Sequence, residues 1–292
     1  MKRMIQHVFY HSADFDGYCS GAVVKHRFPD AELHPINYNQ PFPWEIVKPE
    51  DTVYMVDFGL QPFEQMIKLN ALCRLIWIDH HISAIEAWKA SGETILGKRE
   101  VGRGACELTW EYLYPDIEMP RFVYLLGRYD VWDHSDQALW DNEILPFQYG
   151  LRLNDTDPLK NWVFWNNLFQ ADNSFYENTI DRGKMIMSYV AQTSARYMHS
   201  HAYEMQFEGL RALAVNMGNV SSNFFESMYN PSRHDIMVAY SYIRGQFWGV
   251  TLYSDKPEVN CAVLAKRYGG GGHKGAAGFS CKDLPFGLLT AE

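Results

Sequence analysis

The sequence predicts an α/β protein: a parallel, doubly wound N-terminal domain, a helical linker, and a smaller α/β C-terminal domain. Three observations predict this class. Strand-like and helix-like segments alternate over the first 80 residues, helical periodicity dominates from about 105 to 205, and strand-like alternation then returns. A length of 292 residues also suggests two domains. The predicted boundaries are 1–190 for the first domain, 191–205 for the linker and 206–292 for the second domain.

Three apolar runs are the predicted strands of the first domain: "HVFYHS" (7–12), "DTVYMVDFGL" (51–60) and "LCRLIWIDHH" (72–81). They are apolar almost throughout, which is typical of strands that helices cover on both faces. Between them, 17–29 has helical spacing and stops at Pro29, and 61–71 is a second helical segment. Strands that alternate with helices favour a parallel sheet.

The remaining elements follow in two groups. The predicted helices span 104–114, 121–134, 161–170 and 176–205, and the last is long enough to bridge two domains. The predicted strands of the second domain span 210–218, 234–245 and 247–254, and 260–279 indicates a helix, a glycine loop and a strand.

Composition excludes several classes of protein. A net charge of −9 argues against a protein that coats long nucleic acid, but leaves room for a short anionic substrate. Five scattered cysteines favour a reduced, cytoplasmic protein. The N-terminal segment lacks the apolar core of a secretory signal, and no run approaches the roughly 20 apolar residues of a membrane span. We therefore expect a cytoplasmic location and no membrane partner.

Each predicted N-terminal strand ends in residues that can bind metals. The first leads to His11, Asp14 and Asp16, the second to Asp57, and the third to Asp79, His80 and His81. Ligands of open α/β sheets bind outside the carboxyl ends of the strands, so these three groups should converge at one edge.

Four carboxylates (Asp14, Asp16, Asp57 and Asp130) gathered in a dry cleft would be costly without positive charge. Two divalent cations would balance them. Oxygen and imidazole ligands suit manganese, with zinc or iron as alternatives. Two metals roughly 4 Å apart form a clamp for phosphoryl transfer, and a water activated between them would act as the nucleophile.

Five segments resemble, in order and approximate spacing, the motifs of the DHH phosphoesterase superfamily. They are "HSADFDG" (11–17), "VDFG" (56–59), "IDHH" (78–81), "GRYD" (127–130) and, for the DHH-associated C-terminal domain, "GGGGHKGAAGF" (269–279). The resemblance covers nearly the whole chain. Relatives with both domains include the exonuclease RecJ, nanoRNases that act on very short oligonucleotides, and cyclic-dinucleotide phosphodiesterases.

The resemblance implies a role for each motif residue. His11, Asp14 and Asp57 would bind one metal. Asp16, Asp57, His80 and Asp130 would bind the other, so that Asp57 bridges the two ions. Asp79 would orient a histidine from behind the ligands, and His81 would face the substrate phosphate. Gly17 would let the chain turn into the following helix.

The resemblance also implies substrate contacts. Gly270, Gly271 and Gly272 would bring backbone N–H groups close to the substrate, and His273 and Lys274 would contact its phosphate or terminal nucleotide. Arg103 lies where relatives often place another contact. One position departs from the family: many relatives have an arginine in a pattern like "SLRS", where this chain has "TLYS" with Tyr253. Tyr253 could stack on a base or hydrogen-bond a phosphate.

Simpler interpretations remain open for several residues. Asp14 and Asp16 are also good helix N-caps. Asp133 and His134 could replace Asp130 as ligands. The glycine run could be a flexible linker. Five aromatic residues could stack nucleobases, although helical spacing favours core packing for most of them: Trp110, Tyr112, Trp132, Trp162 and Trp165.

The sequence thus predicts a hydrolase that uses two divalent ions, most simply Mn²⁺, to cleave short oligonucleotides or linear dinucleotides. One alternative is a phosphomonoesterase that acts on nucleotides such as 3′-phosphoadenosine 5′-phosphate. Another is a nucleotide sensor that binds without cleaving. Homodimerisation stays open.

Overall fold

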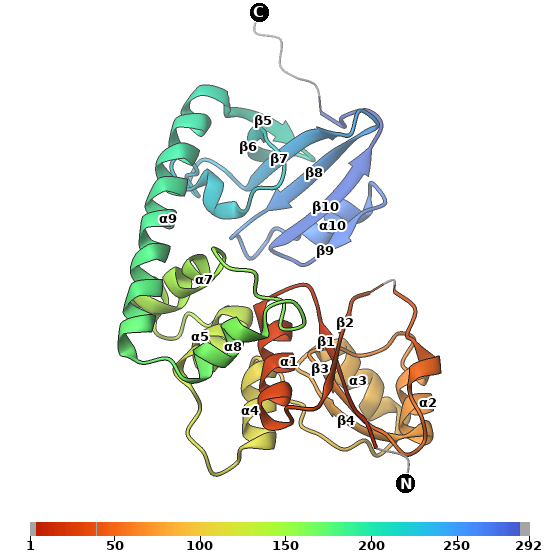
Figure 1. The fold of residues 1–292 in the computed structure, drawn as a ribbon. Coiled ribbons are helices and arrows are strands. Elements are labelled where there is room, and N and C mark those ends of the chain that lie inside the picture. The colour runs from red at the N-terminus through yellow and green to blue at the C-terminus, as the bar shows by residue number, and fades with distance from the viewer. Residues whose placement is uncertain (1–3, 39, 287–292) are drawn as a thin grey trace, which may run out of the picture. The chain divides into compact units, whose positions relative to one another are not determined.

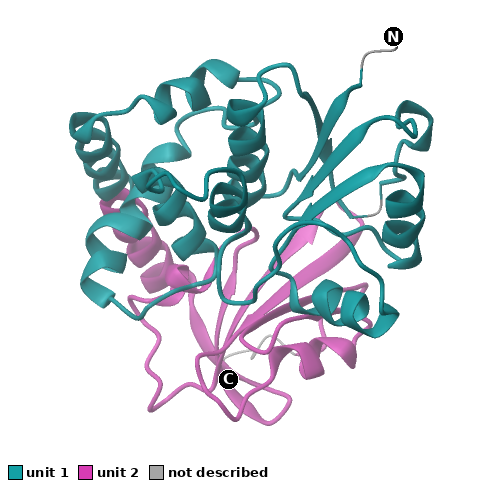
Figure 2. Cartoon of the chain, turned by 90° about the horizontal axis from the view of Figure 1, so that it is seen from below, with its two compact units in different colours: residues 1–186 teal, residues 187–292 magenta. Residues whose placement is uncertain are grey.

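The structure is a computed structural model that describes residues 4–38 and 40–286 (Figure 1). The chain divides into two compact units, Met1–Ile186 and Met187–Glu292, which Figure 2 colours separately. Both units are mixed α/β, and the first contains a parallel sheet. The predicted fold class is confirmed.

The first unit is built on a four-stranded sheet of order β2-β1-β3-β4, in which every pair of neighbours is parallel. Its strands are β1 (Gln6–His11), β2 (Glu32–Ile36), β3 (Thr52–Val56) and β4 (Arg74–Ile78). After β1 the chain adds β2 on one side, and it then returns to the other side of β1 to add β3 and β4. The strand order therefore reverses between β1 and β3, and α/β sheets bind ligands at the carboxyl ends of the strands at such a switch point.

Helices cover both faces of this sheet because successive strand residues point to opposite sides. Val8 and Tyr10 pack with residues of α1 (Phe15–Arg27) and α4 (Ala105–Leu113) on one face. Phe9 and Met55 pack with α2 (Glu64–Leu72) on the other, where α3 (Ile82–Ser91) also lies. The sheet is therefore doubly wound.

Strand β2 was absent from the sequence prediction. Its sequence, ELHPI, is short and contains Pro35, which cannot donate a hydrogen bond to a neighbouring strand. The strand is tolerated because it lies at the edge of the sheet, with only β1 beside it.

The rest of the first unit is helical and packs around Phe122, Phe147 and Trp165. Its helices are α5 (Arg121–Asp130), α6 (Gln137–Leu139), the π-helix η2 (Trp140–Ile144), α7 (Leu145–Leu151) and α8 (Trp162–Phe169), and a 3₁₀ turn, η1 (Trp44–Ile46), precedes β3. The long helix α9 (Asn173–His201) crosses from the first unit to the second. It was predicted to extend to residue 205, but the chain turns into a strand at Tyr203.

The second unit has a six-stranded sheet of order β5-β6-β7-β8-β10-β9. The pair β6 and β7 is parallel, and the other pairs are antiparallel. Its elements are β5 (Tyr203–Phe207), β6 (Leu210–Asn216), η3 (Ser222–Phe225), β7 (Ile236–Ile243), β8 (Phe247–Tyr253), α10 (Cys261–Lys266), β9 (Gly271–Gly272) and β10 (Ala276–Cys281). Among the described residues, no helix combines the length and the hydropathy that a membrane span requires.

Candidate metal centre

Three groups of ligand atoms converge at the carboxyl ends of β1, β3 and β4, and one of them (Asp57, His80 and His81) shares a residue with each of the other two. Of those two, the first group consists of His11, Asp14 and Asp57, and the second of Asp16, His80 and Asp130. The atoms of each group lie within 4.8 Å of one another, which is close enough for one ion to contact all three. The six side chains of the first and second groups come from segments up to 119 residues apart, and the structure brings all of them together.

Asp57 belongs to the first group and also contacts His80 of the second. Its Oδ2 is 3.4 Å from His11 Nδ1, and its Oδ1 is 3.2 Å from His80 Nε2. The residue is 1% exposed, and its φ of 55° is in the left-handed region, which aspartate adopts more readily than most residues. The turn after β3 therefore directs one oxygen of the same carboxylate toward each group.

Asp14 and Asp16 flank the start of α1 in different ways. Asp14 is the N-cap: its Oδ1 accepts a hydrogen bond from Gly17 N (3.0 Å), while its Oδ2 lies 3.7 Å from His11 Nδ1. The capping role and a ligand role can coexist, because they use different oxygens. Gly17 lies inside the helix, not at the turn before it, which corrects the expected role.

Asp16 is held by an element that the sequence did not link to it. Its carboxylate accepts hydrogen bonds from Ala105 N (2.7 Å) and Cys106 N (2.9 Å), at the N-terminus of α4. The free N–H groups of a helix N-terminus favour a negative charge. Asp16 Oδ2 is also 3.7 Å from His80 Nε2, so the α4 N-terminus orients Asp16 toward the second group.

The structure distinguishes between the alternatives for the last ligand. Asp130 Oδ2 lies 3.3 Å from His80 Nε2. Asp133 instead accepts hydrogen bonds from Arg128 Nη1 and Ser135 N, and the ring of His134 lies 4.0 Å from that of Trp140. Only Asp130 of these three is directed into the cluster.

Asp79 and His81 form a pair beside the ligands. Asp79 is fully buried, and its Oδ1 accepts hydrogen bonds from His80 N (2.7 Å), His81 N (3.1 Å) and the His81 ring nitrogen Nδ1 (2.7 Å). An ionised carboxylate accepts only, so Nδ1 of His81 carries the proton in this contact. The ring orientation is thereby set, and Nε2 remains available.

The electrostatics of the cluster fit bound cations. His11 Nδ1 and Asp57 Oδ1 are buried and make no hydrogen bond to the described residues, which is costly unless another group contacts them. Burial, and then the charges of Asp57 and Asp130, raise the pKa of Asp16 well above its ordinary value. Burial alone would lower the pKa of His80, but contact with Asp57 and the charges of Asp16 and Asp130 raise it to about 10. These shifts mean that the cluster favours added positive charge, which divalent ions would supply by displacing protons.

This balance predicts how pH affects the stability of the metal-free protein. Burial, and then the charge of Asp57, raise the pKa of Asp130 to about 7, whereas an unfolded aspartate titrates near about 4. The stability that protonated Asp130 contributes to the folded state is complete below about pH 4 and is lost as the pH rises through about 7. Chelator-treated protein should melt at progressively lower temperature over this window.

Thermal unfolding followed by circular dichroism at stepped pH would test this expectation. Asp130→Asn should reduce the decline in melting temperature between about pH 4 and pH 7. Equal declines in melting temperature for the variant and the original protein would contradict the raised pKa of Asp130. Mn²⁺ should raise the melting temperature most at the upper end of this range, because the ion binds the ionised carboxylates.

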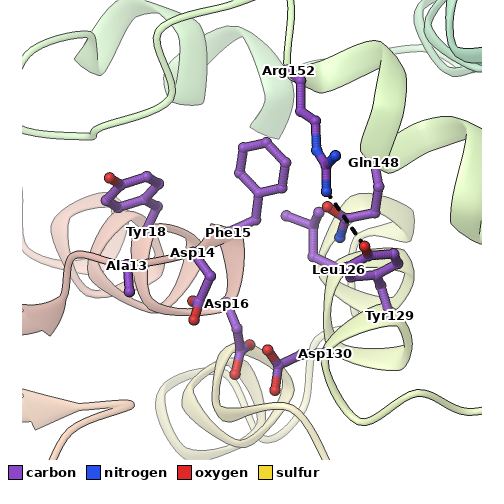
Figure 3. Close-up of a pocket in the computed structure, with 10 residues that line it drawn as sticks. All are labelled: Ala13, Asp14, Phe15, Asp16, Tyr18, Leu126, Tyr129, Asp130, Gln148 and Arg152. Atoms are coloured by element: carbon purple, nitrogen blue, oxygen red, sulfur yellow. Dashed lines mark hydrogen bonds between the residues drawn. The ribbon is translucent and has the colours of Figure 1, made fainter. Parts of the chain in front are cut away.

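A cavity of about 230 Å³ adjoins the cluster in the first unit. Asp14, Asp16 and Asp130 form part of its wall, opposite apolar residues and one cation, as Figure 3 shows. The remaining lining residues are Ala13, Phe15, Tyr18, Leu126, Tyr129, Gln148 and Arg152. No motif in the sequence indicated Gln148 and Arg152, because no local pattern marks one polar residue in α7 and another just after it as neighbours of the start of α1.

The expected substrate contacts lie in different settings. Arg103 Nη2 pairs with Glu111 Oε1 at 2.5 Å, and its Nε lies 3.7 Å from Glu107 Oε2. Its guanidinium is thus already bound to carboxylates. In the second unit, the Tyr253 hydroxyl donates to Val220 O at 2.6 Å. The expected use of that hydroxyl for a phosphate would require this bond to break.

The glycine run is part of the second sheet. Gly271 and Gly272 form β9 and pair with β10. A Cβ at Gly270 would lie 2.1 Å from Gly278 O, and the φ of Gly272 is 143°. His273 and Lys274 follow in an exposed tight turn closed by the bond from His273 N to Ala276 O. The segment is therefore a packed hairpin and not a flexible linker.

Comparisons with known proteins agree with this fold. No protein-family model matches the chain. The uncharacterized protein R106 of Acanthamoeba polyphaga mimivirus is 23% identical over 321 positions, which cover 100% of this chain and 70% of that protein. Among solved structures, the pGpG-specific phosphodiesterase PggH from Vibrio cholerae matches with a TM-score of 0.56 and 11% identity, over 96% of this chain and 93% of that chain.

Two further solved structures are similar. The DHH domain of PF0399, which belongs to a family of ribosomal proteins, matches with a TM-score of 0.56 and 12% identity, over 95% of this chain and 82% of that one. An exopolyphosphatase-related protein from Bacteroides fragilis matches with a TM-score of 0.50 and 13% identity, over 98% and 88%. At these identities the likeness concerns the fold. The chain thus shares its fold with solved DHH-domain proteins.

Proposed function

We propose that this chain is a member of the DHH phosphoesterase superfamily that hydrolyses short oligonucleotides or linear dinucleotides with the help of two divalent ions, most simply Mn²⁺. One observation carries the proposal: a single buried carboxylate, Asp57, directs its two oxygens toward two separate groups of ligand atoms. The fold shared with a phosphodiesterase and an exopolyphosphatase-related protein supports the phosphoester chemistry.

His11, Asp14 and Asp57 would hold one ion, and Asp16, Asp57, His80 and Asp130 the other. Such a pair lowers the pKa of water and stabilises negative charge on phosphoryl oxygens. The protein supplies orientation: the α4 N-terminus holds Asp16. Asp79 fixes the ring of His81. Burial would lower the pKa of His81, but the hydrogen bond to Asp79 raises it, so the doubly protonated ring can donate a hydrogen bond from Nε2 to a phosphate oxygen.

The cavity beside the cluster supports a small substrate. Phe15, Tyr18 and Tyr129 provide aromatic surface on which a nucleobase can stack. The Oε1 atom of the buried Gln148 has no hydrogen-bond partner among the described residues, so it can accept from a base amino group. We propose that one nucleotide of the substrate lies here. The glycine hairpin with His273 and Lys274, and Arg103, stay proposed substrate contacts.

Arg152 provides the cavity with its positive charge. Of the described residues that line it, only Arg152 is cationic, and its Nη2 is 3.4 Å from the Tyr129 hydroxyl. Arg152→Ala should raise the KM for a 5′-phosphorylated dinucleotide by roughly 10-fold to 100-fold, because a hydrogen bond to a charged group contributes about 1.5–3 kcal/mol. The kcat should change much less.

Steady-state kinetics would test this prediction. Lys89→Ala is the matched control, since it removes an equal charge from an exposed position on α3, and its KM should stay at the original value. Arg152→Lys should recover part of the loss, because lysine keeps the charge but not the planar fork. A KM unchanged by Arg152→Ala would place the phosphate elsewhere.

Turnover of a defined substrate panel tests the function itself. RNA and DNA of two to ten residues, cyclic dinucleotides and nucleotide bisphosphates would each be incubated with Mn²⁺, Zn²⁺, Fe²⁺ or Mg²⁺. Preferred cleavage of two- to four-residue substrates is the expected result. Preference for a bisphosphate would favour a phosphomonoesterase, and tight binding without turnover would favour a sensor; either result contradicts the proposal.

A further inference from the structure

A further group of ligand atoms, separate from those around Asp57 and His80, lies at the opposite end of the parallel sheet. It consists of His7 on β1 and of Glu32 and His34 on β2. His7 pairs with Glu32 in the register of the two strands, and His34 is two residues further along, so the three side chains share one face. His11 is four positions after His7, which corresponds to roughly 13 Å along a strand. This group is therefore distinct from the proposed catalytic centre.

The spacing of the three atoms fits one small ion. His7 Nδ1 lies 3.0 Å from His34 Nε2 and 3.7 Å from Glu32 Oε2, and His34 Nε2 lies 4.0 Å from the same oxygen. Tetrahedral zinc, with bonds of about 2.0–2.1 Å, separates its ligand atoms by about 3.4 Å. The three observed separations bracket this value, so small side-chain adjustments would complete the geometry.

A buried carboxylate supports the histidine from behind. Asp51 Oδ2 lies 3.4 Å from His7 Nε2. Asp51 is itself fixed, because Ile5 N donates to its Oδ1 at 3.0 Å and Lys48 N donates to its Oδ2 at 2.9 Å. When His7 Nε2 carries the proton toward Asp51, Nδ1 has a lone pair for an ion placed between it, His34 Nε2 and Glu32 Oε2. Histidines that bind metals are commonly oriented by a carboxylate in this way.

The group combines a rigid inner side with access from solvent. The His7 side chain is 2% exposed, that of His34 is 24% exposed, and that of Glu32 is 54% exposed. The His34 ring stacks on Phe9 with centroids 4.8 Å apart, which restrains its orientation. An ion can therefore enter beside Glu32 and meet two imidazoles that are already positioned.

We propose that His7, Glu32 and His34 form a zinc-binding site that links β1 to the edge strand β2. Two imidazoles and one carboxylate form a donor set that suits zinc better than manganese, and the exposed side leaves room for a water as fourth ligand. The ion would hold the edge strand in register with its neighbour. The site requires no contribution from the proposed catalytic centre.

Zinc binding to the whole chain tests the proposal. After chelation and dialysis, the metal content would be measured by equilibrium dialysis against Zn²⁺ for the original protein, His34→Gln and Glu32→Gln. Each variant should bind one equivalent less than the original protein. Glu45→Gln, which makes the same change at another exposed position, should bind as much as the original protein. Glu32→Gln keeps the test valid if the more buried His34→Gln fails to fold.

Crystals soaked in Zn²⁺ and measured at the zinc absorption edge would locate the ion. The expected result is an anomalous peak between His7 Nδ1, His34 Nε2 and the Glu32 carboxylate, in addition to any peak near Asp57. Peaks confined to the Asp57 region, or equal zinc content in Glu32→Gln and Glu45→Gln, would overturn the proposal. The group would then be a hydrogen-bonded chain from Asp51 through His7 to His34.

Discussion

Asp57→Asn should reduce phosphodiester hydrolysis by roughly three orders of magnitude or more, the largest loss expected of any single substitution in this chain. The amide retains one oxygen, and its NH₂ group cannot bind a cation. Because the two oxygens of Asp57 face separate ligand groups, one proposed ion loses a ligand atom, and the other exchanges a charged oxygen for a neutral one. Two metals contribute several kcal/mol of charge stabilisation, and about 4 kcal/mol corresponds to roughly 10³ in rate.

The variant should still fold. Asparagine tolerates the left-handed backbone of this position, where φ is 55°, and it has nearly the same shape as aspartate. Loss of one charge also relieves the repulsion between Asp57 and the carboxylates of Asp16 and Asp130. In the original protein, burial and then this repulsion raise the pKa of both carboxyl groups. Circular dichroism should therefore show an unchanged spectrum, while equilibrium dialysis should show weaker binding of Mn²⁺.

Asp133→Asn is the matched control. Asp133 lies three residues after Asp130 and pairs with Arg128, so the same chemical change there should leave Mn²⁺ binding and turnover close to the original values. Retention of more than about a tenth of the activity by a folded, Mn²⁺-supplemented Asp57→Asn protein would show that Asp57 does not bridge two ions.

Gly17→Ala should have the second-largest effect, on stability and activity together. A Cβ at this position would lie 2.0 Å from His11 O and 2.8 Å from His11 Cβ, which no real contact permits. The helix α1 would have to move away from β1. Overpacking of this kind typically costs about 1–3 kcal/mol. The same movement would separate Asp14 and Asp16 from His11, so hydrolysis should fall by at least about 10²-fold even where the protein folds.

Gly59→Ala provides the comparison. Its Cβ would lie 3.4 Å from Ala84 Cβ and 3.6 Å from Asp79 Oδ2, both ordinary contact distances, so the free energy of unfolding in urea should change little. Urea denaturation of the two variants and the original protein, together with kinetics at saturating Mn²⁺, measures both effects. Gly17→Ala with unchanged stability would mean that α1 can pack against β1 at a greater distance than the structure has.

The carboxyl ends of β1, β3 and β4 could be predicted because their signal is local. A strand covered on both faces is a continuous apolar run, so "DTVYMVDFGL" and "LCRLIWIDHH" mark both the strands and the polar residues that follow them. Parallel strands then place those residues at one edge without further information. Strand β2 lacked this signal, because its five residues include two polar side chains and Pro35 and so form no continuous apolar run, although they fit an edge strand.

The sequence alone therefore determined the α/β class and the residues that gather at the switch point, because both depend on patterns within one or two elements. Only the tertiary structure decided that Asp57 faces both histidines, that the N-terminus of α4 orients Asp16, and that Gln148 and Arg152 line a cavity beside them. It also placed His7 beside His34. These contacts join residues far apart in the chain, and their distances depend on how whole helices and strands pack, which no local pattern records.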